Sequence, residues 1–91
     1  MRVQDGVAYP EGPITLVEAV HVRLDGDAAL ASGCDVIDLA GITQVDSSAL
    51  SVLLAWRRNA LNSNRQLVLR NPPANIHSLI ELYGIGELIP S

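Results

Sequence analysis

The sequence has no lysine and no phenylalanine, a single cysteine and only 3% aromatic residues. The lone Cys34 excludes an internal disulfide and is typical of a reducing compartment. The net charge of −4 argues against binding to nucleic acid, which needs a basic surface. Because 48% of the residues are hydrophobic, the core can still be built from leucine, isoleucine, valine and alanine.

Long apolar runs are also missing. No run approaches the roughly 18–20 residues of a membrane span, and no basic-then-apolar N-terminal segment of the signal-peptide type occurs. The sequence therefore predicts a cytoplasmic protein without direct membrane insertion. Its 91 residues predict a single domain over 1–91.

Hydrophobic periodicity and turn residues predict strands that alternate with helices. Such an order is typical of an α/β fold with parallel strand pairs and right-handed crossovers. We expect a small mixed sheet with about three to four helices packed on it. The predicted elements are a strand pair in 2–9 with a turn at Asp5-Gly6, a helix from Thr15, a strand in 34–41, a helix over 47–62, a strand over 65–70, and a helix between Asn71 and Gly84.

Each predicted helix has an expected start and an expected buried face. Thr15 and Glu18 have the spacing of a capping box, and Asn71 is placed to cap the last helix. Apolar residues recur at helical spacing and predict the faces that pack on the sheet. These faces are Leu16, Ala19, Val20 and Leu24 in the first helix, Ala49, Leu50, Leu53, Leu54 and Leu61 in the second, and Ile76, Leu79, Ile80 and Tyr83 in the third.

The stretch Asp46-Ser47-Ser48 sets a carboxylate and two hydroxyls directly before an apolar helix. A nucleophilic serine would need a positioned base and an oxyanion hole. His21 and His77 each lie inside a predicted amphipathic helix, and no Gly-x-Ser-x-Gly elbow surrounds the serines. The sequence therefore predicts that the protein is not an enzyme.

Metal and cofactor binding find little support. One cysteine and two separated histidines offer no ligand pair. Asp35, Asp38 and Asp46 would have to converge at a sheet edge to hold Mg²⁺. The favoured interpretation is that Asp38 braces loop amides, because buried acids are usually paired. No glycine-rich loop is present to bind phosphate, and no cofactor is predicted.

A helix cap is the simplest role for Asp46, whose negative charge suits the helix dipole. Ser47 and Ser48 then occupy the first helical turn, where small side chains permit close approach of a partner. A phosphate added there would meet free amides and would change the charge of the surface. The stretch is therefore well suited to be a switchable interface.

The segments VIDLAGITQVDSSALSVLLAWRR and NRQLVLRNPPANIHSLIELYGIGELIP resemble the STAS domain family, named for sulfate transporters and anti-sigma factor antagonists. The resemblance covers roughly residues 34–90, and residues 2–33 agree only in the order of elements. It implies a STAS-like fold and a non-catalytic role in binding another protein. Ser47 matches the family's modifiable or partner-contacting hydroxyl, Asp46 the acid before it, and Ser48 its neighbour.

Two subclasses of the family are implied. The first is the small STAS subunit of Mla-type ABC complexes, which binds and supports the cytoplasmic ATPase of a Gram-negative phospholipid transporter that maintains outer-membrane lipid asymmetry. The second is the anti-sigma factor antagonist, switched when a kinase-type anti-sigma factor phosphorylates the residue matching Ser47. Ala49, where antagonists usually have glycine, and the tail LYGIGELI favour the Mla-type subunit, which would place the protein at the inner membrane through its partner.

Further partner contacts are expected along the same helix. Trp56 and Arg57 are candidates for the rim of the interface, because tryptophan and arginine often anchor interfaces. Ala49 and Val52 lie between them and the serines. An alternative for Trp56 is packing within the domain, because tryptophan is mostly buried on average.

Overall fold

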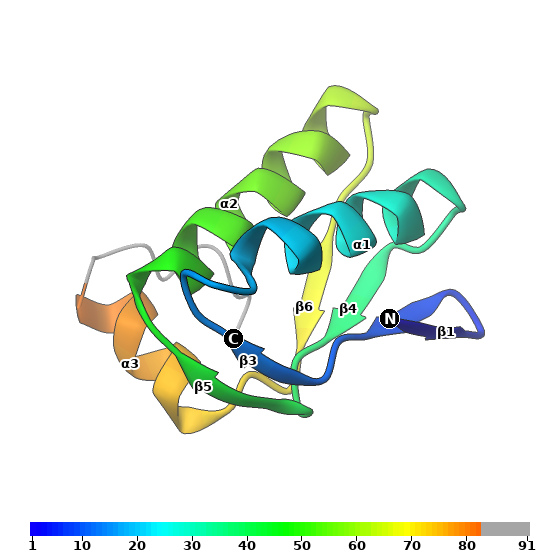
Figure 1. The fold of residues 1–91 in the computed structure, drawn as a ribbon. Coiled ribbons are helices and arrows are strands. Elements are labelled where there is room, and N and C mark those ends of the chain that lie inside the picture. Colours follow the sequence, from blue (N-terminus) through cyan, green and yellow to red (C-terminus); the bar gives the residue numbers. More distant parts are fainter. Residues whose placement is uncertain (83–91) are drawn as a thin grey trace.

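The computed structural model describes residues 1–82, which form six strands and three helices (Figure 1). The predicted mixed α/β class is confirmed. In chain order the elements are β1 (Arg2–Gln4), β2 (Val7–Tyr9), β3 (Gly12–Ile14), α1 (Ala19–Ala31), β4 (Val36–Asp38), β5 (Ile42–Val45), α2 (Ser47–Asn62), β6 (Val68–Arg70) and α3 (Ala74–Leu82).

Four of these strands form a mixed sheet in the order β1-β2-β4-β6. β1 and β2 pair antiparallel across Asp5 and Gly6, whose φ angles of 52° and 77° suit the type I′ turn of a two-residue hairpin. β4 lies between β2 and β6 and is parallel to both. The predicted strand pair in 2–9 and the predicted strand in 34–41 are therefore confirmed.

The remaining strands, β3 and β5, pair in parallel as a separate two-stranded sheet. No strand was predicted between the strand in 34–41 and the helix over 47–62, so β5 was missed. Thr43 and Gln44 are both exposed, so the segment lacks the alternation of apolar and polar residues that marks a half-buried strand. Within residues 1–82 the strands therefore form two sheets, where one was expected.

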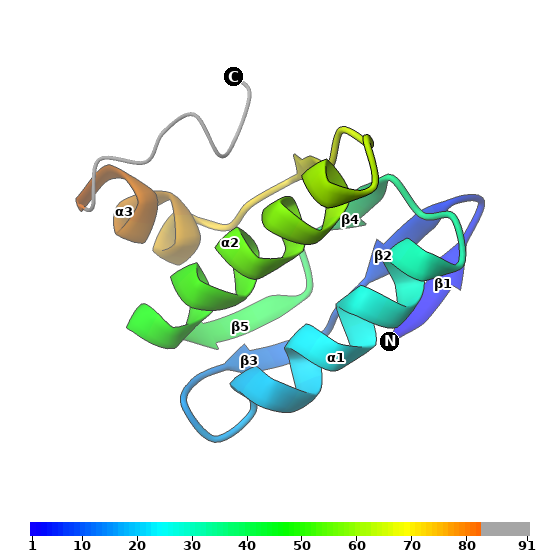
Figure 2. The same cartoon turned by 90° about the horizontal axis from the view of Figure 1, so that it is seen from above.

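Helices α1 and α2 lie side by side over the strands, and α3 packs against α2 and β5 (Figures 1 and 2). Apart from Trp56 and Cys34, the buried core cluster is aliphatic. None of the helices in residues 1–82 is long and apolar enough to cross a membrane. The largest fully buried side chains are Trp56, Ile14, Ile37, Leu39, Leu53 and Ile76.

Helix α1 differs from its prediction in start and in orientation. It begins at Ala19, because the Thr15 hydroxyl donates to the Glu18 carboxylate and neither side chain caps a helix amide. Most of the side chains that were predicted to form its buried face are exposed. Its large side chains Leu16, Val20 and Leu24 are exposed, and the helix instead buries Gly26, Ala29 and Leu30. α1 carries apolar residues on both sides, so periodicity could not determine which side meets the core.

Helix α2 runs from Ser47 to Asn62, as predicted. Ala49, Leu50 and Leu53 are buried, but Leu61 is 57% exposed and was wrongly assigned to the buried face. Ala60, seven residues after Leu53, occupies that face instead. A helix turns by about 100° per residue, so Leu61 is rotated away from the core.

Asp38 is the buried acid at the end of β4, with only 6% of its surface exposed. Its carboxylate accepts hydrogen bonds from the Ala40 amide at 2.9 Å, and from Arg70 Nε and Asn71 Nδ2 at 3.0 Å each. Arg70 also donates to the Tyr9 hydroxyl at 3.2 Å. The bracing role of Asp38 is confirmed. Asn71 serves this network and does not cap α3 as predicted.

The last strand and helix follow their predicted patterns. In β6 Leu69 is buried, and Leu67 just before the strand packs partly against the core. Helix α3 begins three residues after Asn71 and is described from Ala74 to Leu82. The predicted face residues Ile76 and Ile80 are buried and Leu79 is half-buried, whereas Tyr83 and the expected helix end at Gly84 lie outside the described residues.

Candidate protein-interaction site at the start of helix α2

Asp46 caps the N-terminus of α2, as predicted. Its backbone is extended, with φ −128° and ψ −169°, and its Oδ1 accepts a hydrogen bond from the Ser48 amide at 2.8 Å. That amide is one of those that a helix leaves free at its N-terminus. The cap therefore fixes the position at which Ser47 and Ser48 enter the helix.

The second oxygen of Asp46 makes a contact that the sequence did not indicate. Oδ2 accepts from the Leu16 amide at 3.0 Å, thirty residues earlier in the chain. The Leu16 and Ser48 amides, in that order, hold the pKa of Asp46 below its ordinary value. One carboxylate thus connects the turn that precedes α1 with the N-terminus of α2.

Two substitutions distinguish the bridge, which is the hydrogen bond from the Leu16 amide to Asp46, from the cap, which is the hydrogen bond from the Ser48 amide. Asp46→Ala removes both acceptors, and we expect a Tm lower by about 4–8 °C, the effect of losing a typical N-cap in a domain of this size. Asp46→Ser keeps a cap for the Ser48 amide but is too short to reach Leu16 as well. We expect it to recover most of the Tm, while hydrogen exchange at the Leu16 amide is faster in both variants. Unchanged exchange at Leu16 in Asp46→Ala would show that the bridge is absent in solution.

The two serines differ in accessibility. Ser47 is exposed and Ser48 is half-buried, and both lie in the first turn of α2. Within residues 1–82, neither His21 nor His77 forms a hydrogen bond with either hydroxyl. The arrangement displays a hydroxyl at a fixed helix end.

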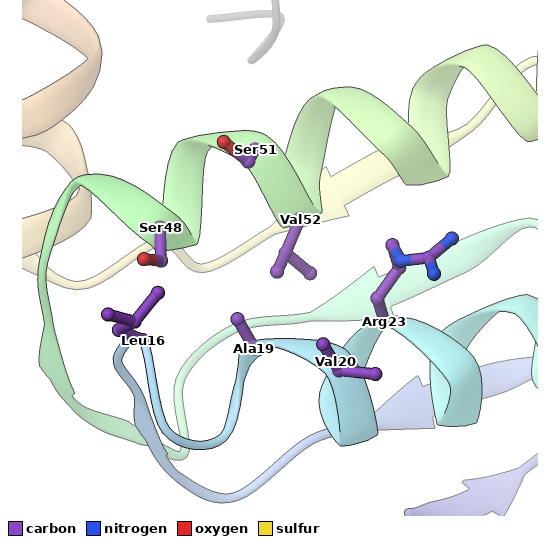
Figure 3. A pocket seen from close by; sticks show the side chains of 7 residues that line it. All are labelled: Leu16, Ala19, Val20, Arg23, Ser48, Ser51 and Val52. Atoms are coloured by element: carbon purple, nitrogen blue, oxygen red, sulfur yellow. The ribbon is translucent and has the colours of Figure 1, made fainter.

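A shallow groove of about 270 Å³ runs beside the serines, between α1 and α2 (Figure 3). One wall comes from α1 and the turn before it, and the other from the first two turns of α2. Figure 3 shows Leu16 facing Ser48, and Val52 pointing toward Ala19 and Val20. The lining residues are Leu16, Ala19, Val20, Arg23, Ser48, Ser51 and Val52.

Three of the predicted partner contacts lie in the core. Ala49, Val52 and Trp56 are 1%, 1% and 0% exposed, so the prediction that these side chains form a partner surface needs correction. Val52 contributes only to the lining of the groove. Arg57 is half-buried next to Trp56. The accessible part of the predicted site is Ser47, together with the half-buried Asp46, Ser48 and Arg57.

Trp56 packs inside the domain and does not lie at the rim of an interface, the two roles that the sequence left open for it. Its ring lies against Gly26 of α1, so closely that a Cβ on Gly26 would stand 2.2 Å from Trp56 Cε2. Its Nε1 donates to the Arg23 carbonyl at 3.0 Å. Tryptophan therefore joins α1 to α2 from inside the domain.

The acids considered for Mg²⁺ serve other purposes. Asp38 accepts hydrogen bonds from the Ala40 amide, Arg70 and Asn71, and Asp46 accepts from two backbone amides. Asp35 accepts from Arg65 Nε at 2.8 Å. Among residues 1–82 no three histidine, cysteine or acidic side chains gather as metal ligands would.

The site was only partly visible in the sequence. The exposed aliphatic side of α1 was missed, because the same residues were expected to be buried. One feature of the sequence does indicate a second buried side. Gly26, Ala29 and Leu30 form another apolar stripe on α1, and the small side chains of this stripe leave room for a large neighbour. Two apolar stripes on one short helix imply that one of them faces outward.

Comparison with known proteins agrees with this architecture. A solved structure of the anti-sigma factor antagonist SpoIIAA in its unphosphorylated form superposes with a TM-score of 0.70. It shares 18% sequence identity, and the match covers 92% of this chain and 76% of that one, so the likeness concerns the fold. No curated protein matches the chain in sequence. The family model described as "Mlab, STAS domain" matches residues 11–90, and the chain therefore belongs to the MlaB-type STAS domain family.

Proposed function

We propose that this STAS domain, extending over residues 1–91, is the non-catalytic subunit that binds and supports the cytoplasmic ATPase of an ABC phospholipid transporter. The observation that carries the proposal is the match of residues 11–90 to the MlaB-type family. On this proposal the protein resides in the cytoplasm, held at the inner membrane by its partner, and contributes to outer-membrane lipid asymmetry.

The geometry of the α2 N-terminus supports a binding role. Asp46 holds the helix end in place, Ser47 is exposed on it, and an aliphatic groove opens beside it. A preformed surface loses little conformational freedom when a partner binds, which favours affinity. STAS domains generally act as regulatory or binding domains. These features suit a protein contact at Ser47.

Ser47→Glu tests the proposal with little risk to the fold. A negative charge in the first turn of a helix is favourable to the helix itself. Against the partner, the longer glutamate side chain is expected to obstruct close approach at Ser47 and to weaken binding of the ATPase at least tenfold in calorimetric titration. Ser78→Glu is a matched control, because Ser78 is exposed on α3. Equal affinities of wild type and Ser47→Glu would contradict the proposal.

The second candidate function is that of an anti-sigma factor antagonist. The likeness in fold to SpoIIAA and the exposed Ser47 hydroxyl favour it. It predicts that a kinase-type anti-sigma factor transfers phosphate from ATP to Ser47. Mass spectrometry after incubation with the kinase and ATP would reveal a phosphate on the peptide that contains Ser47. Its absence, together with tight binding to the ATPase, would exclude this candidate.

A further inference from the structure

The outward side of α1 is an exposed aliphatic surface. Leu16 and Val17 in the turn before the helix are 76% and 82% exposed, and Val20 and Leu24 on the helix are 58% and 52% exposed. Val20 and Leu24 lie four residues apart on the same side of α1, and Leu16 lies four residues before Val20 in the preceding turn. Exposed aliphatic groups gathered in this way are typical of an interaction surface. We call these four residues the α1 patch.

The α1 patch is continuous with the proposed contact at Ser47. Leu16 and Val20 line the groove from one side, and Ser48 and Ser51 line it from the other. The Asp46 carboxylate bonds to the Leu16 and Ser48 amides and so connects the two walls. A partner that reaches Ser47 therefore has the groove and the α1 patch directly beside its contact.

The size of the groove favours a side chain as its occupant. Its volume of about 270 Å³ is below the roughly 300–1,000 Å³ of small-molecule sites. A cleft between two helices with an aliphatic lining is the geometry in which a partner's amphipathic helix lays its apolar side. The groove therefore fits one anchoring aliphatic side chain of a third helix.

Charge argues against a second copy of this chain as the occupant. Residues 18–27 carry Glu18, Asp25 and Asp27 against Arg23, a net charge of −2. Arg23 is paired with Asp27 at 3.7 Å, and Asp25 lies 4.0 Å from the N-terminal ammonium of Met1, although its side chain remains 60% exposed. Two copies would bring like charges together, whereas a basic segment would be attracted.

From these features we infer that the ATPase partner docks an amphipathic, basic helix along the α1 patch and inserts an aliphatic side chain into the groove. This inference rests on the proposed function and extends its contact from Ser47 onto α1. Asp46 acts as a positioning residue, because its carboxylate accepts from the Leu16 and Ser48 amides and so holds both walls of the groove.

Two lysine variants with equal charge test the inference. Val20→Lys alters the patch, and Leu61→Lys alters a side chain of nearly equal exposure, 57% against 58%, in the last turn of α2. Calorimetric titration of each with the ATPase is expected to show at least a tenfold loss of affinity for Val20→Lys and less than a twofold change for Leu61→Lys. Val17→Lys repeats the test outside the helix, and added salt is expected to weaken wild-type binding.

The possible outcomes distinguish a failure of the proposed function from a failure of the inference about the α1 patch. If wild type binds, Ser47→Glu weakens binding and both patch variants bind like wild type, the proposed function stands and the inference is overturned. If wild type does not bind the ATPase, both fail. Concentration-dependent dimerisation of wild type that Val20→Lys abolishes would assign the patch to a second copy, and would also overturn the inference.

Discussion

Replacement of Trp56 by alanine is expected to lower the free energy of unfolding by about 3–5 kcal/mol, measured by urea titration followed by circular dichroism. Trp56 is fully buried and is the largest side chain of the core. Its removal leaves a cavity between α1 and α2 and deprives the Arg23 carbonyl of its donor. Domains of this size have total stabilities of only about 5–15 kcal/mol, so the variant is expected to be close to unfolding.

The partner of Trp56 across the interface gives a matched experiment. Gly26→Ala would normally favour a helix, yet the new methyl group would stand 2.2 Å from the Trp56 ring. We expect a loss of about 1–3 kcal/mol, the range for overpacking a core. Ala28→Gly, at an exposed position of α1, is the control for helix propensity alone.

The close contact also predicts that the two positions are coupled. In the double variant Gly26→Ala with Trp56→Leu, the smaller side chain leaves room for the methyl group. The combined loss of stability is therefore expected to be less than the sum of the two single losses. Additive losses would contradict the packing of Trp56 against Gly26.

Asp38→Ala is expected to cost about 2–3 kcal/mol at neutral pH, as expected for losing hydrogen bonds to a buried charged group. The carboxylate accepts from the Ala40 amide, Arg70 and Asn71 and so connects the ends of β4 and β6. Arg70 is partly exposed and can turn to solvent, which keeps the cost in this range. Asp38→Asn keeps the size of the side chain and isolates the contribution of the charge.

The same network predicts a pH dependence. Burial raises the pKa of Asp38, but the bonds from Ala40, Arg70 and Asn71 together outweigh it and hold that pKa below its ordinary value. Ionised Asp38 therefore stabilises the fold above about pH 3.9, and this contribution is lost as the pH falls toward the lower pKa of the folded state. The stability difference between wild type and Asp38→Asn is expected to shrink from pH 7 to pH 3. A constant difference would contradict the assignment.

The sequence predicted the α2 region well because several local signals agree there. Asp46 is a strong cap, Ser47 and Ser48 are typical of a first turn, and the apolar spacing that follows is helical. Both ends of α2 and the cap were therefore correct. The hairpin at Asp5-Gly6 was correct for a similar reason, because its turn residues favour positive φ.

The wrong or missed predictions concern features whose structure depends on contacts between residues far apart in the sequence. The orientation of α1 depends on Gly26 meeting Trp56, thirty residues later, and no local pattern reveals that contact. The strand at Ile42–Val45 depends on pairing with β3. The bond from the Leu16 amide to Asp46 likewise spans thirty residues, so the connection between the serines and the α1 patch became visible only in the folded chain.

The most direct test of the docking surface is an amide NMR titration of the isotope-labelled domain with its ATPase. We expect the largest changes in chemical shift and line width on residues 16–24 and 47–52, on both sides of the groove. Changes confined to β1, β2 or the exposed side of α3, with residues 16–24 and 47–52 unaffected, would contradict this expectation.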